Sequence, residues 1–420
     1  MICRLKFFIS RLRERLWVKP LAMCILSIAA AFLVKTADYG RMGQFAPIIS
    51  PETIETLLKV ISASMLVIAT FAVGSMVSSY TSASGTATPR SFPLIISDDV
   101  SQNALSSFIG AFIYSIVALI ALLNGYYQTG GLFVLFCLTL LVFAAVILTF
   151  VRWVDCIARL GLLGNTIDKV ESATLKACEE RRLAPTLGGV PAKPQSDEGE
   201  PIYGSTVGYV RQVDVAKLQE CAEVGDVRIR VASLPGAFST PDQPLAYIIG
   251  KAPDPADVDT ERMISAFKVG DDRTFDEDPR FGLVALSEIA SRALSPAVND
   301  PGTAIDIIGT FVRIFIFWNQ PVDDDQKAPC KYDRVEIPEL SIHDMFEDAF
   351  LAMGRDGAGT VEVGIRLQKA FHALANAGDS EMRDAAKTQS SLALARAELV
   401  LQLPEDLREI RRLSESVGAT

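Results

Sequence analysis

Histidine is nearly absent from this sequence, which contains only His343 and His372 among its 420 residues. Two histidines without paired spacing argue against a histidine-based metal site. The seven cysteines show no CxxC spacing, which indicates reduced and mostly buried thiols rather than a disulfide framework. We therefore expect no metal, no cofactor and no catalytic residue, and we predict that the protein is not an enzyme.

Basic residues are scarce in the second part of the chain. Residues 183–420 hold 24 Lys and Arg against 39 Asp and Glu, whereas residues 1–182 hold 16 against 11. A nucleic-acid-binding surface needs a basic footprint, so nucleic acid is not an expected partner.

Four long apolar runs, at 21–34, 57–77, 104–123 and 132–151, contain no charged residue except Lys59 near the start of the second. Runs of this kind predict helices that cross a lipid bilayer. Without an ionisable group deep in a span, a proton-coupled carrier is disfavoured. We predict a multi-pass membrane protein with a four-span transmembrane domain over residues 21–151.

The first run is short for a bilayer, and six basic residues precede it. A cleaved signal peptide is the rival interpretation, but three further spans favour an uncleaved anchor. Residues 1–20 also suit a basic amphipathic helix on an anionic membrane surface. Positive charges before the first span and after the fourth place both termini in the cytoplasm, next to the inner (plasma) membrane.

The second span is unusually long, because no charged residue occurs between Val60 and Pro89, and its second half is rich in Ser, Thr and Gly. Small residues on one helical face favour close helix packing, or else they line a water-filled pore in a homo-oligomer. Both roles are compatible on different sides of one helix. The pore-lining candidates are Ala63, Thr70, Gly74, Ser78 and Thr81, with Arg90 at the cytoplasmic mouth.

The remaining chain predicts a cytoplasmic α+β domain. Residues 152–182 continue as a helical stalk, and the Pro- and Gly-rich segment 183–201 indicates a linker. Alternating apolar residues over 202–252 predict a small β-barrel-like module with a Gly-Pro hairpin. Residues 253–420 are mainly helical.

Two Asp-Pro pairs mark helix starts in that helical part. Asp278 and Asp300 each precede a proline that opens an apolar periodic segment, and Ser341 is a further N-cap candidate. The segment Arg292–Pro301 is then a corner between two helices. It is either purely architectural or a ligand or subunit contact; the contact candidates are Arg273, Asp278, Arg292, Asn299 and Asp300.

Several stretches together resemble one family of bacterial membrane proteins, known as domain of unknown function 2254. They include TPR at Thr88–Arg90, FIGAFIY at Phe108–Tyr114 and GYVRQVD at Gly208–Asp214. The longest is DPRFGLVALSEIASRALSPAVNDPGTA, and DAFLAMGRDGAG follows at Asp348–Gly359. The resemblance implies four N-terminal spans and a cytoplasmic domain, and it supplies no catalytic residue. Relatives tend to carry histidines where this sequence has RWVD, so no histidine role is implied.

The hypothesis that follows is a homo-oligomeric inner-membrane channel or pore, lined by the second span and assembled or gated by the cytoplasmic domain. The alternative is a membrane-anchored scaffold or sensor that binds a partner protein or small ligand at the Arg292–Pro301 corner.

Overall fold

A computed structural model describes residues 17–39, 47–96, 99–160, 162–192, 199–250, 258–323 and 325–418. The chain divides into two compact units, Met1–Thr166 and Ile167–Thr420. Most of the segment predicted as a basic amphipathic helix, residues 1–20, lies outside the described residues.

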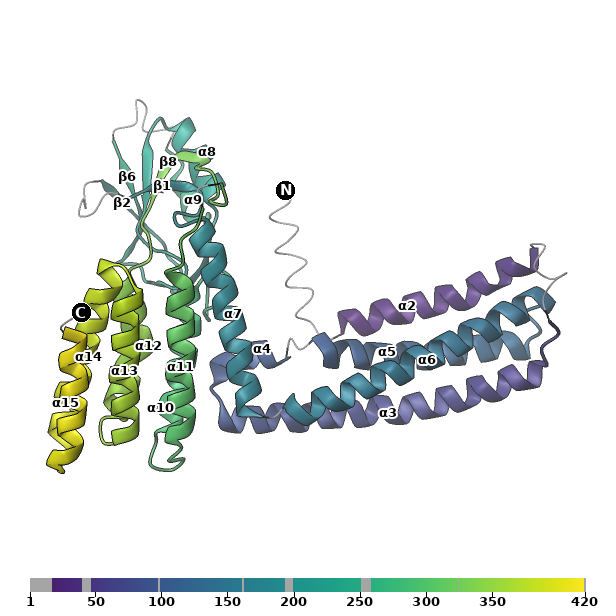
Figure 1. Cartoon of the computed structure of the whole chain (residues 1–420). Coiled ribbons are helices and arrows are strands. Elements are labelled where there is room, and N and C mark those ends of the chain that lie inside the picture. The colour runs from purple at the N-terminus through teal and green to yellow at the C-terminus, as the bar shows by residue number, and fades with distance from the viewer. Residues whose placement is uncertain are drawn as a thin grey trace. The chain divides into compact units, whose positions relative to one another are not determined.

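The first unit is built from long helices that run side by side (Figure 1). Within its described part they are α2 (Val18–Leu33), α3 (Pro51–Thr86), α5 (Asp99–Leu123) and α6 (Thr129–Leu160). Helix α5 packs against α2, α3 and α6. The shorter elements are η1 (Val34–Tyr39), η3 (Pro89–Ser91) and α4 (Phe92–Ile96).

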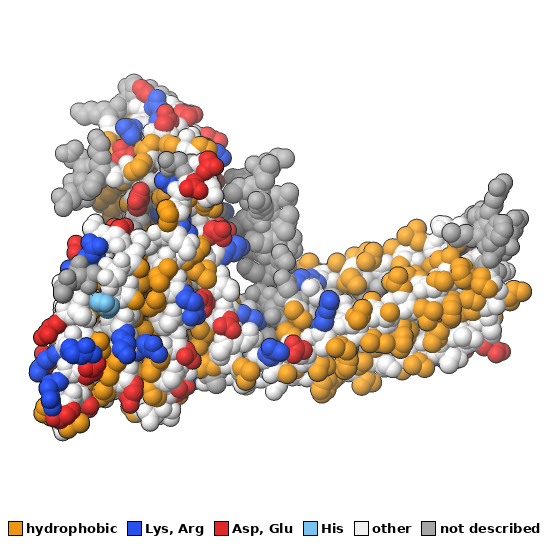
Figure 2. All heavy atoms as spheres, viewed as in Figure 1, with side chains coloured by type: hydrophobic (Ala, Val, Ile, Leu, Met, Phe, Trp, Pro, Cys, Tyr) orange, Lys and Arg blue, Asp and Glu red, His pale blue; other side chains and the backbone are white. Residues whose placement is uncertain are grey.

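Each of these four helices is long and apolar enough to cross a membrane. The chain itself buries only 11% to 39% of the most apolar window in each. Figure 2 shows the visible outer face of this unit covered largely by hydrophobic side chains. An apolar outer surface of this extent needs lipid or protein around it, because water solvates it poorly.

A fifth helix of the described chain, α11 (Pro301–Trp318), also passes the length and composition test. Its buried face carries Phe311 and Phe315, which contact Phe350 and Phe346 of α12 (Ile342–Asp356). Its exposed face carries Arg313, which pairs with Glu171 of α7 (Leu163–Leu183) at 2.6 Å. These contacts identify α11 as an amphipathic helix of the second unit's own core.

Helix α3 extends the predicted span at both ends. Its 36 residues correspond to about 54 Å at 1.5 Å per residue, against about 30 Å of bilayer hydrocarbon. The helix ends where Thr88 takes an extended conformation, φ −109° and ψ 155°, as expected before a proline.

The second unit contains two separate sheets. The five-stranded sheet has the order β1-β8-β4-β6-β2, and the three-stranded sheet has the order β5-β3-β7. Strand β8 is parallel to β1 and β4, while the remaining pairs are antiparallel. The strands are β1 (Gly189–Pro191), β2 (Glu200–Tyr203), β3 (Gly208–Val213), β4 (Arg228–Val231), β5 (Phe238–Ser239), β6 (Pro244–Ile249), β7 (Phe267–Gly270) and β8 (Tyr332–Ile337).

The prediction of a barrel-like module was therefore wrong: these sheets do not close on themselves. Strand β8 joins the sheet from residues 332–337, far beyond 202–252, and β1 and part of β2 arise within the segment 183–201 that we predicted as a linker. Alternation of apolar and polar residues predicts a strand, but it does not tell which other strand, about 100 residues away, will pair with it.

Helices account for the rest of the second unit. Besides α7, α11 and α12 they are α8 (Val215–Val224), α9 (Thr260–Ile264), α10 (Pro279–Ala293), α13 (Val361–Ala377), α14 (Ser380–Val400) and α15 (Pro404–Gly418). The expected caps are confirmed, since Asp278, Asp300 and Ser341 accept hydrogen bonds from Phe281 N, Thr303 N and Asp344 N. The predicted stalk, 152–182, is divided between the end of α6 and α7.

Candidate functional site

The outer face of α3 is the first candidate site. Ile61, Met65, Ala69, Ala72 and Met76 are buried on the inner face, where α3 packs against α5 and α6. Side chains predicted to line a pore are all exposed within one chain: Ala63, Thr70, Gly74, Ser78, Thr81 and Arg90.

The small residues of α3 form a stripe opposite its buried face. At about 100° of rotation per residue, Ala63, Thr70, Gly74, Ser78 and Thr81 lie within an arc of roughly 80°. The centre of that arc is about 180° from the centre of the buried face. A Cβ added at Gly74 would meet nothing within 4 Å. The exposed side chains of Val60 and Val67 lie within the same arc. We call this face the small-residue stripe; nothing in the described chain covers it at Gly74.

Hydroxyl groups on this stripe are partly satisfied by their own helix. Thr70 Oγ1 donates to Leu66 O, and Thr81 Oγ1 donates to Val77 O, each at 2.9 Å. A back-bonded hydroxyl is tolerated in apolar surroundings. The stripe therefore suits either close contact with another helix or the wall of an aqueous pathway.

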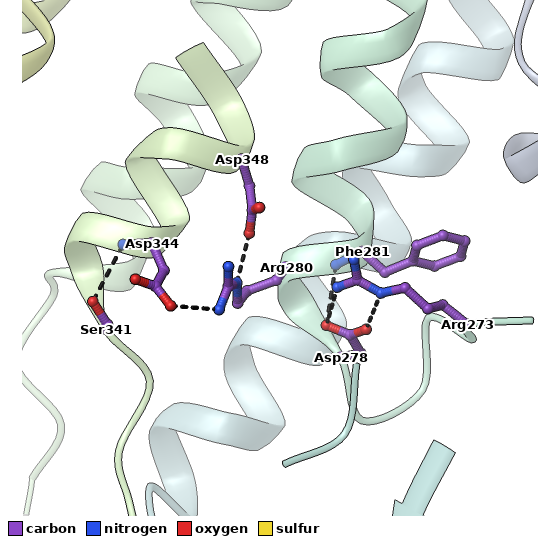
Figure 3. A network of polar contacts seen from close by, with 7 residues as sticks. All are labelled: Arg273, Asp278, Arg280, Phe281, Ser341, Asp344 and Asp348. Carbon is purple, nitrogen blue, oxygen red and sulfur yellow. Dashed lines mark hydrogen bonds and ion pairs between the residues drawn. The ribbon is translucent and has the colours of Figure 1, made fainter. Parts of the chain in front are cut away.

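The start of α10 forms the second polar centre (Figure 3). Asp278 is 4% exposed and accepts from Arg273 Nε at 2.7 Å and Nη2 at 3.0 Å, as well as from Phe281 N at 3.1 Å. Burial raises the pKa of Asp278, and the pairing with Arg273 opposes this. The Arg273 guanidinium also lies 5.2 Å from the centre of the Phe281 ring. These contacts fasten the loop before α10 to its first turn.

Arg280 connects α10 to α12 beside this cap (Figure 3). Its Nη1 lies 2.7 Å from Asp344 Oδ2, and its Nε lies 2.6 Å from Asp348 Oδ2. Burial lowers the pKa of Arg280, but the two carboxylates outweigh it and leave a net rise. The central motif and the Asp348–Gly359 stretch therefore meet through a forked ion pair.

The structure does not bring the five predicted contact residues together. Arg273 and Asp278 lie at the start of α10, whereas Arg292, Asn299 and Asp300 lie at its other end, about 22 Å of helix away.

At the Arg292–Pro301 corner the polar groups serve the turn itself. Asp300 binds both the backbone N–H and the hydroxyl of Thr303, and Asp300 N donates to Ala293 O at 2.8 Å. Asn299 adopts a left-handed conformation, φ 51°, which asparagine tolerates better than most residues. These are the contacts that a structural corner requires.

Sequence reasoning missed a polar pocket in the second unit. The cavity measures about 250 Å³ and is formed by the end of α7, the end of α11 and the starts of α12 and α14. Three cations and three carboxylates line it: Arg181, Arg182, Lys327, Glu339, Asp379 and Glu381. The adjacent arginines Arg181 and Arg182 could have indicated this pocket in the sequence, but we interpreted them only as positive charges that follow the fourth span.

Beside this pocket lies a carboxyl group with a strongly shifted pKa. Burial raises the pKa of Glu277 to about 7, although Gln212 Nε2 donates to its Oε1 at 2.8 Å and Lys268 and Arg181 favour the charged form. Glu277 therefore carries a proton for part of the time near neutral pH.

Outward-facing apolar helices joined to an α+β unit define this chain as a membrane protein, and comparison with known sequences gives its family. The chain belongs to the family described as "Predicted membrane protein (DUF2254)", whose model matches residues 13–373. The resemblance inferred from the motifs is thereby confirmed.

Similar proteins occur in mycobacteria. The uncharacterized proteins Mb1321c of Mycobacterium bovis and Rv1290c of Mycobacterium tuberculosis are each 28% identical over 324 residues, which is 73% of this chain. The matched region covers 61% of each relative's own length. No solved structure matches this chain.

Proposed function

We propose that this protein is a homo-oligomeric membrane channel, with α3 lining the pathway and the second unit assembling or gating it. The small-residue stripe carries the proposal, because it is the face of α3 turned farthest from the chain's own helices. Copies that meet along this stripe would surround a pathway bordered mainly by small and hydroxyl side chains, with Val67 among them. Arg90, exposed beyond the end of α3, would lie at its mouth.

The membrane arrangement belongs to the same proposal. The helices α2, α3, α5 and α6 would cross a bacterial inner membrane, with both termini in the cytoplasm. The lipid bilayer and further copies of the chain would be the principal partners. The proposal assigns no enzymatic activity, because Ala63, Thr70, Gly74, Ser78 and Thr81 bring hydroxyl and small side chains to the stripe and no carboxylate or amine.

Planar-bilayer conductance of the purified full chain tests the proposal, with Gly74→Trp and Val73→Trp as matched variants. Both positions are exposed, but Val73 lies about 100° away around the helix, outside the stripe. We expect discrete wild-type openings that Gly74→Trp suppresses and Val73→Trp retains. Native mass spectrometry of each variant separates a blocked pathway from a dissociated oligomer.

Absence of conductance from a folded wild-type oligomer, or equal conductance in both variants, would refute the pore. The alternative is a membrane-anchored scaffold or sensor that uses the Arg292–Pro301 corner. The exposed side chain of Val298, 51% accessible at the tip of the corner, favours a protein partner there. Loss of a co-purifying partner on Val298→Asp, with conductance absent throughout, would support this second function.

A further inference from the structure

Arg181 is a buried cation that forms no ion pair within the described chain. Its residue is 4% exposed, and its Nε is buried without a hydrogen-bond partner. Within the described chain its guanidinium makes one hydrogen bond, from Nη2 to Pro338 O at 3.3 Å, and no ion pair. A guanidinium has five N–H donors, and leaving buried donors unused is costly.

The charge of Arg181 persists in this environment. Burial lowers its pKa to about 10, while Glu277, Glu339 and Asp278 oppose that shift. The group is therefore protonated at neutral pH. Glu277, the acid with the largest effect, is itself partly neutral there because its own pKa is about 7.

Arg182 presents a second guanidinium to the same pocket. It stacks over the Phe317 ring at 4.6 Å and donates from Nη2 to Gln320 O at 2.5 Å, while its buried Nε has no hydrogen-bond partner. These contacts hold the planar group in place. Each guanidinium carries a planar fork of N–H donors of the kind that recognises carboxylate and phosphate groups.

The lining of the pocket also carries three carboxylates, Glu339, Asp379 and Glu381. Asp379 and Glu381 come from the start of α14, and each uses one oxygen within the protein, for Met382 N and Ile342 N respectively. Glu339, from the segment before α12, is exposed. Because the lining carries equal numbers of positive and negative groups, a ligand with both charges fits it better than a simple anion.

We propose that this pocket binds a small zwitterionic metabolite, with its anionic group on the two arginines and its amino group facing the three carboxylates. A volume of about 250 Å³ lies below the roughly 300–1,000 Å³ of pockets that bind drug-sized ligands, which points to a small molecule. The inference does not depend on the pore.

Isothermal titration of the full chain in nanodiscs tests this, with phosphoethanolamine as the zwitterionic probe. Inorganic phosphate carries only the anionic group of this probe, and ethanolamine carries only its amino group. We expect phosphoethanolamine to bind more tightly than phosphate, and ethanolamine not to bind. A short-chain phosphatidylethanolamine identifies the source of the ligand, since tighter binding than phosphoethanolamine indicates a lipid headgroup and equal or weaker binding a free metabolite.

Arg181→Met should weaken phosphoethanolamine binding at least about tenfold, which is the loss expected for one charge-assisted contact. Arg408→Met removes an exposed arginine of the same unit and should leave binding unchanged. Glu381→Gln should reduce the preference for phosphoethanolamine over phosphate. Thermal unfolding checks the fold, because replacing a buried unpaired arginine by methionine should not lower stability.

Trp318 borders the pocket and supplies an independent signal. Phosphoethanolamine should change the fluorescence of the wild-type chain, and Trp318→Phe should abolish the change. No saturable binding of phosphoethanolamine or phosphate up to about 10 mM, beyond the usual range of specific ligands, would overturn the proposal. Unaltered affinity in Arg181→Met would overturn it equally.

Discussion

Arg280 of α10 donates to Asp348 of α12 across 2.6 Å, and this contact links the two most distinctive sequence stretches of the second unit. The Arg280 side chain is 30% exposed and that of Asp348 is 18% exposed. The pair is therefore shielded from water more than an ordinary surface ion pair.

Removal of this link should destabilise the second unit. We expect Arg280→Met to lower the free energy of unfolding by about 1–2 kcal/mol, since partly buried charge-assisted contacts exceed surface pairs. A double-mutant cycle with Asp348→Asn, measured by chemical unfolding, should give a coupling of about 1 kcal/mol. The control is Arg355→Met, whose pair with Asp356 is more exposed, and which should change stability by less than about 0.5 kcal/mol.

Gly236 is required by the buried cap at Asp278. Its φ is +94°, and an added Cβ would lie 2.4 Å from Asp278 Oδ2. We expect Gly236→Ala to cost about 3 kcal/mol, from backbone strain together with overpacking. Gly250 has a similar φ of +98° and open space around it, so Gly250→Ala should show the strain alone, about 1 kcal/mol. Equal thermal shifts for the two variants would contradict this account.

In the first unit, Asp38 caps the start of α6 from a segment about 90 residues earlier. Its carboxylate accepts from Gln128 N at 3.0 Å and from Gly131 N at 2.5 Å. We expect Asp38→Ala to cost about 1–2 kcal/mol, as the loss of an N-cap does. Thermal unfolding in nanodiscs measures it, with Asp155→Ala as control because Asp155 is exposed beside Arg159. Indistinguishable melting of the two variants would exclude a capping role.

Glu277 should make stability fall as pH rises. Its folded pKa of about 7 exceeds its ordinary value of 4.5, so the folded state binds more protons between these values. Below pH 4.5 the Glu277 carboxyl is protonated in both the folded and the unfolded state, and its contribution to the free energy of unfolding is fully present. This contribution is lost as the pH rises through about 7, where the buried carboxyl must become charged. The free energy of unfolding should therefore differ between low and high pH by at most about 3 kcal/mol, at 1.36 kcal/mol per pKa unit.

The variant Glu277→Gln tests the sign. Relative to wild type it should gain stability progressively from pH 4.5 to 8, while retaining an amide that can contact Gln212. Chemical unfolding at several pH values measures the difference. A gain that is instead largest at low pH would mean that the Glu277 pKa is lowered by folding.

Short-range patterns in the sequence determined much of this protein. The uncharged run after Val60 predicts a long apolar helix because backbone hydrogen bonds must be satisfied locally in lipid. Asp278 and Asp300 predict helix starts, because an aspartate before a proline can accept a hydrogen bond from a free backbone N–H of the first helical turn. The family motifs likewise lie in continuous stretches that the sequence shows directly.

Only the tertiary structure decided which distant segments meet. The pairing of β8 with β1 and β4 joins strands whose alternation is compatible with many partners, so a barrel and an open sheet look alike in sequence. Arg273 and Arg292 both resemble ligand-binding residues, yet α10 holds them at opposite ends because a helix sets a fixed rise per residue. In the sequence, Arg181 is one of several basic residues of the predicted stalk. Its burial becomes visible only in the structure, because the residues of α11, α12 and α14 that exclude water from it lie far away in the sequence.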